Sequence, residues 1–167
     1  MTIFIFYILL PVLLIIPFEF ITFCLHKYVM HGFGWAWHQS HHEKQGKGIE
    51  KNDWFILVFS LVAILLFLIS SLHPSNSYLS IITRSLAIGW CLYGVCYFMV
   101  HDIVIHRRIS NNFVKKIKNP YLKRLIRAHA IHHKHIGKEH SKAFGFLYAS
   151  NKYRFPSAST QKGDNSD

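Results

Sequence analysis

Residues 54–72 read WFILVFSLVAILLFLISSL and carry no charged side chain over 19 positions. Two more apolar runs accompany this stretch: residues 2–25, where Glu19 is the only charge, and residues 78–100, where Arg84 is the only charge. A helix needs about 20 apolar residues to cross a bilayer. A buried core helix is the alternative for 54–72, but three such runs do not fit a soluble domain of 167 residues. The sequence therefore predicts three membrane spans.

The distribution of basic residues predicts the orientation of these spans. Three crossings place residues 26–53 and 101–167 on one side, and 18 of the 19 Lys and Arg residues lie in these two segments. Positive charge accumulates on the cytoplasmic side of membranes. We therefore expect an integral protein of the cytoplasmic (inner) membrane whose C-terminus faces the cytoplasm. Residues 143–149 are apolar but too few to span, and we expect them to return to the bilayer and close the site.

Composition excludes several other classes of protein. The apolar share of 51% excludes a disordered chain. Three cysteines, all inside predicted spans, exclude a disulfide scaffold. The formal net charge of +11 would suit a nucleic-acid binder, but no nucleic-acid motif accompanies it. Attraction to anionic lipid headgroups explains the charge, so we expect the lipid bilayer, and no nucleic acid, as a partner.

Ten of the thirteen histidines fall into four short motifs. The pattern is H-x4-H followed by H-x2-H-H, and it occurs twice: HKYVMH (26–31) with HQSHH (38–42), then HDIVIH (101–106) with HAIHH (129–133). Each copy begins where a predicted span ends, so both copies meet at one membrane face. Imidazole binds Zn, Cu, Fe and Ni alike. Ten imidazoles exceed the needs of one ion, so the sequence predicts a centre for two metals.

The spacing within each motif has geometric consequences. Positions i, i+3 and i+4 share one helix face, so H-x2-H-H can present three imidazoles together. For the second copy, Asn119 and Pro120 predict a helix start, and Gly137 predicts a stop. Residues of H-x4-H differ by about 140° on an ideal helix. Either a distortion such as a π-bulge aligns them, or they serve different metals, and the spacing leaves both alternatives open.

Several neighbours of the clusters are candidates for supporting roles. Asp102, His135 and Glu139 flank the motifs and could orient ligating imidazoles. For Asp102 the alternative is an ion pair with Arg107 or Arg108. Four aromatic residues near the first copy either line a substrate channel or form an interfacial belt: Phe33, Trp35, Trp37 and Trp54.

The motifs and the text between them resemble a known family. HKYVMHGFGWAWHQSHH (26–42), YFMVHDIVIHRR (97–108), YLKRLIRAHAIHH (121–133) and GKEHSKAFGFLYA (137–149) resemble the membrane fatty-acid hydroxylase and desaturase superfamily, and within it the bacterial β-carotene 3-hydroxylases that form zeaxanthin. The resemblance covers about residues 20–150. It implies a non-haem di-iron centre with ten ligands, which are His26, His31, His38, His41, His42, His101, His106, His129, His132 and His133.

We therefore expect an all-α integral membrane bundle of three to four transmembrane helices with a histidine-rich cytoplasmic metal-binding cap. One domain is expected over residues 1–155, with histidine segments 26–53 and 101–140. A polar tail, residues 156–167, is expected to be disordered.

The resemblance implies O2-dependent hydroxylation of the β-ionone rings of β-carotene at C3, giving β-cryptoxanthin and then zeaxanthin. The chain shows no flavin, haem or Fe–S motif, so electrons must come from outside; the resemblance implies ferredoxin or a similar carrier, with NAD(P)H upstream. A related di-iron hydroxylase, ketolase or desaturase acting on another membrane lipid is the alternative. A metal transporter is more remote, because it would place ionisable residues near the midplane of the membrane. A non-catalytic structural protein is the third alternative.

Overall fold

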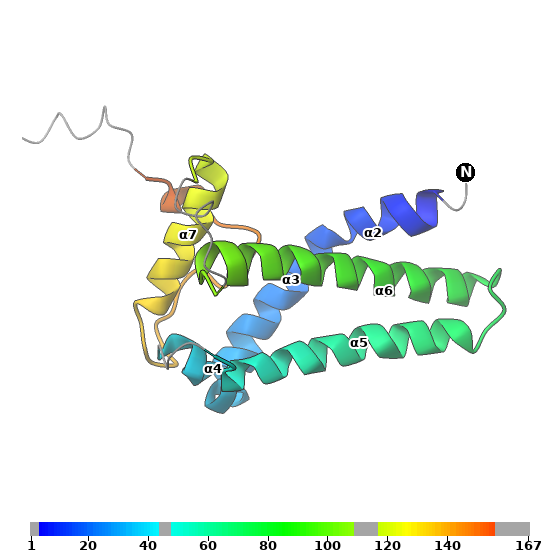
Figure 1. Ribbon diagram of the computed structural model, residues 1–167, viewed down its shortest axis with the longest axis horizontal. Coiled ribbons are helices and arrows are strands. Elements are labelled where there is room, and N and C mark those ends of the chain that lie inside the picture. The colour runs from blue at the N-terminus through cyan, green and yellow to red at the C-terminus, as the bar shows by residue number, and fades with distance from the viewer. Residues whose placement is uncertain (1–3, 44–47, 109–116, 156–167) are drawn as a thin grey trace, which may run out of the picture.

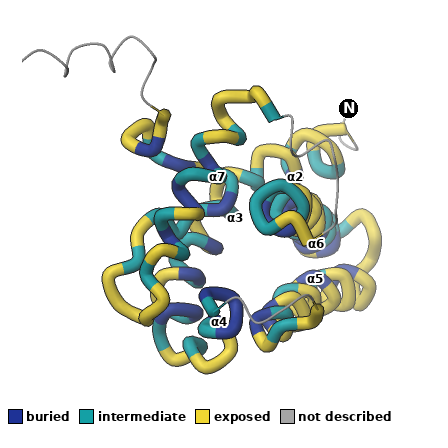
Figure 2. The backbone as a smooth tube through the Cα atoms, turned by 60° about the vertical axis from the view of Figure 1, so that its left-hand side comes forward, coloured by how far each residue is buried: buried dark blue, intermediate teal, exposed yellow. Residues whose placement is uncertain are grey.

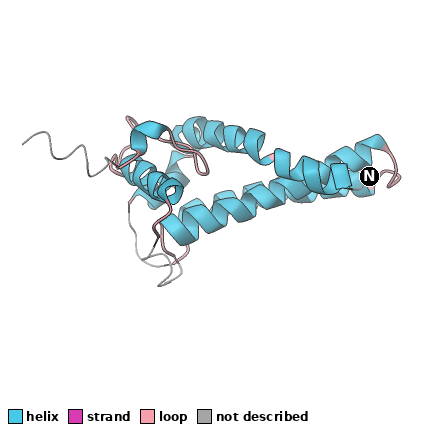
Figure 3. Ribbon diagram, turned by 90° about the horizontal axis from the view of Figure 1, so that it is seen from above, coloured by secondary structure: helices cyan, strands magenta, loops and turns pink. Residues whose placement is uncertain are grey.

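The computed structural model describes residues 4–43, 48–108 and 117–155, and the tail predicted to be disordered lies outside them. The described residues form helices and loops without a strand (Figure 3). In chain order the elements are η1 (Ile5–Leu9), α2 (Leu10–Leu13), α3 (Ile15–Cys24), η2 (Leu25–Phe33), α4 (Trp35–His42), η3 (Lys51–Asp53), α5 (Trp54–Ser71), α6 (Tyr78–Tyr97), η4 (Phe98–Ile105), α7 (Pro120–His133) and η6 (Asn151–Tyr153).

The helices α5 and α6 form a long hairpin, and the N-terminal helices η1, α2 and α3 run beside α6 (Figure 1). The uninterrupted helices Lys51–Ser71 and Tyr78–Ile105 are each long and apolar enough to cross a membrane. The hairpin buries few side chains, and on α5 these are Phe55, Ala63 and Ser70. Large apolar residues that remain exposed along such a helix are suited to contact lipid. The predicted spans 54–72 and 78–100 thus correspond to α5 and α6.

The first predicted span, residues 2–25, is a bent helix. Segments Ile5–Leu13 and Ile15–Phe33 meet at an angle of 42°. Together they are long and apolar enough to form one broken span. The bend falls at Leu14 because Pro17 has no N–H to donate to the carbonyl of Leu13. The described chain therefore has two continuous candidate spans and a third that is broken.

Arg84, to which the sequence assigns no role, ties the two long helices together. Its guanidinium donates from Nε to Ser70 Oγ at 3.2 Å and from an Nη to Ser80 Oγ at 3.3 Å. Ser70 and Ser80 are themselves buried and hydrogen-bonded to each other. A cation inside an apolar helix is tolerated when protein groups satisfy it in this way.

Buried residues are concentrated around α4 and α7, at the end of the hairpin away from the turn that joins α5 to α6 (Figure 2). Helix α7 starts as the sequence predicts, because the Asn119 side chain accepts the N–H groups of Tyr121 and Leu122 and Pro120 is the first helical residue. Its apolar side packs into a small core of Leu125, Ala128, Ala149 and Tyr153. The same helix face continues into the histidines, so this core fixes where they point.

Candidate metal centre

The two H-x4-H motifs lie on π-helical turns. His26 and His31 lie in η2, and His101 lies in η4 with His106 as its C-terminal cap. The His106 N–H donates to the His101 carbonyl at 2.9 Å, a bond between residues five apart. This spacing brings residues i and i+5 to nearly the same side of a helix. The His26 and His31 rings are consequently 5.2 Å apart, and the His101 and His106 rings 4.5 Å apart. Of the two alternatives, the π-helical distortion is the one observed.

The two H-x2-H-H motifs lie on α4 and α7. On α4, His38, His41 and His42 are all buried. On α7, His129 and His132 are buried and His133 is half-buried. Each helix therefore directs three imidazoles toward the π-helical turns.

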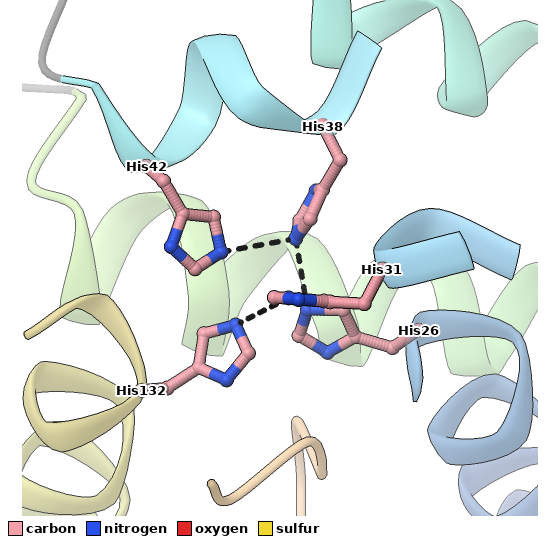
Figure 4. Close-up of side chains that lie close together, drawn as sticks. All are labelled: His26, His31, His38, His42 and His132. Atoms are coloured by element: carbon pink, nitrogen blue, oxygen red, sulfur yellow. Dashed lines mark hydrogen bonds between the residues drawn. The ribbon is translucent and has the colours of Figure 1, made fainter. Parts of the chain in front are cut away.

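The first histidine group consists of His26, His31, His38, His42 and His132, and Figure 4 shows their rings converging. One ring nitrogen from each lies within 4.8 Å of all the others. The Nε2 atoms of His26 and His38 approach to 3.0 Å, and those of His31 and His132 to 3.2 Å. Residues 26–42 and α7, which are remote in sequence, thus direct their imidazole nitrogens to one place.

The second histidine group is built on His41, His106, His129 and His133, whose nitrogens also lie within 4.8 Å of one another. We count His101 with this group because its ring contacts that of His41. The Nε2 of His101 is 3.2 Å from that of His41. The two groups are adjacent, since the rings of His42 and His133 stack at 4.5 Å. All ten histidines of the repeated motif are therefore gathered into two neighbouring groups of five.

In the first group the far side of every ring is tied to a neutral acceptor. The Nδ1 of His26 donates to the Phe144 carbonyl oxygen, and that of His31 to the Lys138 carbonyl oxygen. The Nδ1 of His42 donates to the His135 carbonyl oxygen, and that of His132 to the Lys142 carbonyl oxygen. The Nδ1 of His38 donates to the amide oxygen of Asn52, and all five N–O distances are 2.7–3.1 Å. Because these acceptors cannot donate, each Nδ1 carries the proton and each Nε2 keeps a free lone pair. Four of the five acceptors come from residues 135–149, hereafter the strap.

In the second group two rings meet carboxylates. His41 Nδ1 lies 3.2 Å from Glu50 Oε2, and His101 Nδ1 lies 3.2 Å from Asp102 Oδ1. Arg108 bridges Glu50, Asp53 and Asp102 at 2.9–3.5 Å. Asp102 thus both orients a histidine and pairs with an arginine, the two roles considered from the sequence.

Burial favours the neutral form of the imidazole rings on α4 and α7. Burial lowers the pKa of His38 to about 3 and that of His42 to about 4, because the charged form loses its hydration. The pKa values of His41 and His129 are well below the usual range, through burial first and neighbouring imidazoles second. Neutral imidazoles are the form that binds metal. The donor set therefore fits two metal ions held by Nε2 atoms.

A cavity of about 590 Å³ lies between α5 and α6 and reaches the histidine end of the hairpin. Its walls include Phe59, Ala63 and Trp90, and its inner end includes Tyr97 and Phe146. The Tyr97 ring stacks on His101 at 4.7 Å, the Phe146 ring stacks on His26 at 4.7 Å, and the two aromatic rings are 4.8 Å apart. An apolar chamber thus ends at a pair of rings, each covering one histidine group.

The other residues singled out from the sequence lie around this centre or away from it. His135 contributes its backbone carbonyl, whereas the Glu139 side chain is 84% exposed and lies 4.0 Å from His140. Phe33 is 87% exposed, and Trp37 and Trp54 are also exposed. Trp35 packs against His31 and His42. None of these four aromatic residues lines the cavity between α5 and α6.

Sequence reasoning missed Glu50, Asn52 and the strap carbonyls. A backbone carbonyl leaves no trace in residue type, so four of these partners could not be found from composition. Asn52 sits in the short NDW sequence that opens α5, which offered a local signal. Glu19 is the lone carboxylate in the first predicted span. Ionisable groups inside a span usually have a functional role, so Glu19 also offered a sequence signal for a residue that supports the site.

Helical spans joined to two buried groups of neutral histidines define a class of membrane enzyme built around a metal centre. The chain belongs to the fatty acid hydroxylase family, whose sequence model matches residues 11–150. It is 41% identical over 137 residues to a beta-carotene hydroxylase of Pantoea ananas, covering 81% of this chain and 73% of that one. It is 34% identical over 142 residues to a beta-carotene hydroxylase of a Paracoccus strain, covering 84% and 83%.

A chloroplastic beta-carotene 3-hydroxylase of Haematococcus lacustris is 36% identical over 110 residues, covering 65% of this chain and 33% of that one. No solved structure matches the chain. The protein is therefore a hydroxylase of this family, and its resemblance to bacterial β-carotene hydroxylases is confirmed.

Proposed function

We propose that this hydroxylase uses O2 to hydroxylate the β-ionone rings of β-carotene at C3, giving β-cryptoxanthin and then zeaxanthin. The observation that carries the proposal is the apolar cavity between two candidate membrane helices, which ends against the two histidine groups. Relatives named beta-carotene hydroxylase, at 34–41% identity, support the choice of substrate.

The ten histidines of the two groups are proposed as ligands of two non-haem irons. Cleavage of an unactivated C–H bond lies outside the reach of side-chain acids and bases, and bound iron would supply O2 activation. The chain's own contribution is to favour neutral imidazoles by burial and to exclude water. It also holds the Nε2 atoms of the first group, and those of His41 and His101, inward through hydrogen bonds at Nδ1.

The cavity residues would bind and orient the lipid. A polyene has no hydrogen-bonding groups, which suits walls built mainly of aromatic and aliphatic side chains. Helix α5 rises about 18 Å between Phe55 and Phe67, both of which line the cavity. An elongated apolar molecule could enter from the bilayer along this length and bring its ring toward Tyr97 and Phe146.

Electrons are proposed to come from a ferredoxin-type carrier, with NAD(P)H upstream. The histidine groups and the C-terminus would face the cytoplasm, in the inner membrane, within one hydroxylase domain over residues 1–155. Basic residues on α7 and the strap would attract an acidic carrier. Electron transfer should then slow as salt is added, and a rate independent of salt would contradict this docking.

A related hydroxylase, ketolase or desaturase acting on another membrane lipid would use the same histidines and differ in the cavity. A transporter is disfavoured, because the histidines lie at or beyond the ends of the long helices, on η2, α4, η4 and α7, rather than midway along them.

Expression in cells that accumulate β-carotene, followed by pigment chromatography, separates these functions. Zeaxanthin is expected, and echinenone or unchanged β-carotene would contradict the proposal. The variant His41→Ala should abolish the product.

A further inference from the structure

The two histidine groups differ in the charge of the groups that hold their outer nitrogens. In the first group all five Nδ1 atoms meet neutral oxygens, four backbone carbonyls and the Asn52 amide. In the second group His41 and His101 meet the carboxylates of Glu50 and Asp102. The contrast is one of formal charge, since the N–O distances of the two sets are similar.

The negative charge beside the second group is only partly balanced. Within the part of the chain that the structure describes, Glu50, Asp53 and Asp102 share one cation, the guanidinium of Arg108. Asp102 and the His101 ring it contacts are both buried, at 5% and 2% side-chain exposure. Burial of the pair limits screening by water and salt, and Arg108, 3.5 Å from the same Asp102 oxygen, offsets part of the negative charge.

A carboxylate on the outer nitrogen changes what an imidazole offers a metal. The ring gains electron density as its N–H is drawn toward the anion, and its Nε2 becomes a stronger donor. A neutral carbonyl orients the ring without adding charge. A metal held by the second group is therefore bound by two more basic ligands, His41 and His101, and lies closer to negative charge than a metal held by the first.

We infer that the two metal positions are inequivalent, and that Glu50 and Asp102 are the positioning residues that make them so. The second group takes the first equivalent of metal, and an iron held there is the more easily oxidised of the two. The inference rests on the proposed two-metal centre and deepens it, because it assigns the tighter and more electron-rich position to one set of histidines.

The test loads metal-free protein in lipid nanodiscs with 57Fe(II) without oxygen and follows it by Mössbauer spectroscopy, with a chelator competition to measure the affinity of each equivalent. One quadrupole doublet is expected at one equivalent and a second, different doublet at two. Equal affinities, or both doublets growing together from the start, would overturn the inference.

Three isosteric variants locate the difference. Asp102→Asn keeps an oxygen for His101 but removes the charge, and Glu50→Gln does the same for His41. Each should weaken the tighter position by about 10-fold to 100-fold. The reciprocal variant Asn52→Asp adds a carboxylate beside His38 in the first group, and it should tighten the weaker position. Unchanged affinities in both Asp102→Asn and Glu50→Gln would contradict the assignment, provided that both variants keep wild-type helicity by circular dichroism.

These outcomes are separable from those of the proposed function. Distinct metal positions without hydroxylated carotenoid would refute the function alone. Equal positions in a protein that makes zeaxanthin would refute the inequivalence alone.

Discussion

Glu19 and Phe146 are joined by a hydrogen bond although 127 positions separate them: Oε1 of Glu19 accepts the Phe146 N–H at 2.9 Å. The same oxygen accepts the N–H groups of Leu147 and Tyr148 at 3.0 Å, and Oε2 accepts the Tyr93 hydroxyl at 2.7 Å. The lone acid of the first predicted span therefore holds the strap against α3 and α6. Residues 146–148, which belong to the run expected to return to the bilayer, thus contact the helix of the first predicted span.

Loss of the Glu19 carboxylate should release the strap. Glu19→Ala leaves three N–H groups without their acceptor and is expected to lower the free energy of unfolding by about 3 kcal/mol. Thermal unfolding and limited proteolysis of residues 135–149 would measure the effect. Tyr93→Phe removes one hydrogen bond to the same carboxylate and is the milder control. Equal stability of Glu19→Ala and wild type would contradict a clamp.

Gly145 should tolerate no side chain. A Cβ there would lie 2.5 Å from the Tyr148 carbonyl oxygen and 2.9 Å from Glu19 Oε1. Gly145→Ala is therefore expected to displace the strap, whose carbonyls orient the first histidine group, and to lower bound metal per chain. Gly137→Ala is the matched control in the same strap, because a Cβ there meets nothing within 4 Å. If the two variants bind metal equally, the strap does not support the site.

Each histidine group should lose its own metal. His132→Ala is expected to remove the ion of the first group and His129→Ala that of the second, each leaving about half the metal by elemental analysis, because the remaining group keeps its own ligands. Exposed His73 lies outside both groups, and His73→Ala should retain full metal. Full metal content in both His132→Ala and His129→Ala would refute the ligand assignment.

The cavity between α5 and α6 should control substrate use without affecting metal. Ala63 is buried in its wall, and Ala63→Phe should fill the space and lower hydroxylation at least 10-fold at unchanged metal content. Leu65 is exposed on the same helix and does not line this cavity, so Leu65→Phe controls for added bulk. Normal turnover by Ala63→Phe would place the substrate elsewhere.

Much of this arrangement could be predicted because its signals are local. The uncharged run 54–72 predicts α5, and Asn119-Pro120 predicts the start of α7. The repeated histidine spacing predicts that two remote segments meet, which the two groups confirm.

The remaining features depend on contacts between segments far apart in sequence. The carbonyls of the strap carry no residue signature, and the Asn52 contact with His38 requires α5 to be placed against α4. The cavity arises from the packing of α5 against α6, so aromatic residues near the first motif did not predict its walls.

The central claim is the O2-dependent hydroxylation of a carotenoid ring, and isotope labelling tests it most directly. Purified protein with two irons, β-carotene, a reduced ferredoxin and 18O2 should yield zeaxanthin in which both hydroxyl oxygens carry the label by mass spectrometry. Zeaxanthin labelled instead from H2 18O, or no hydroxylated product from fully loaded protein, would contradict the account.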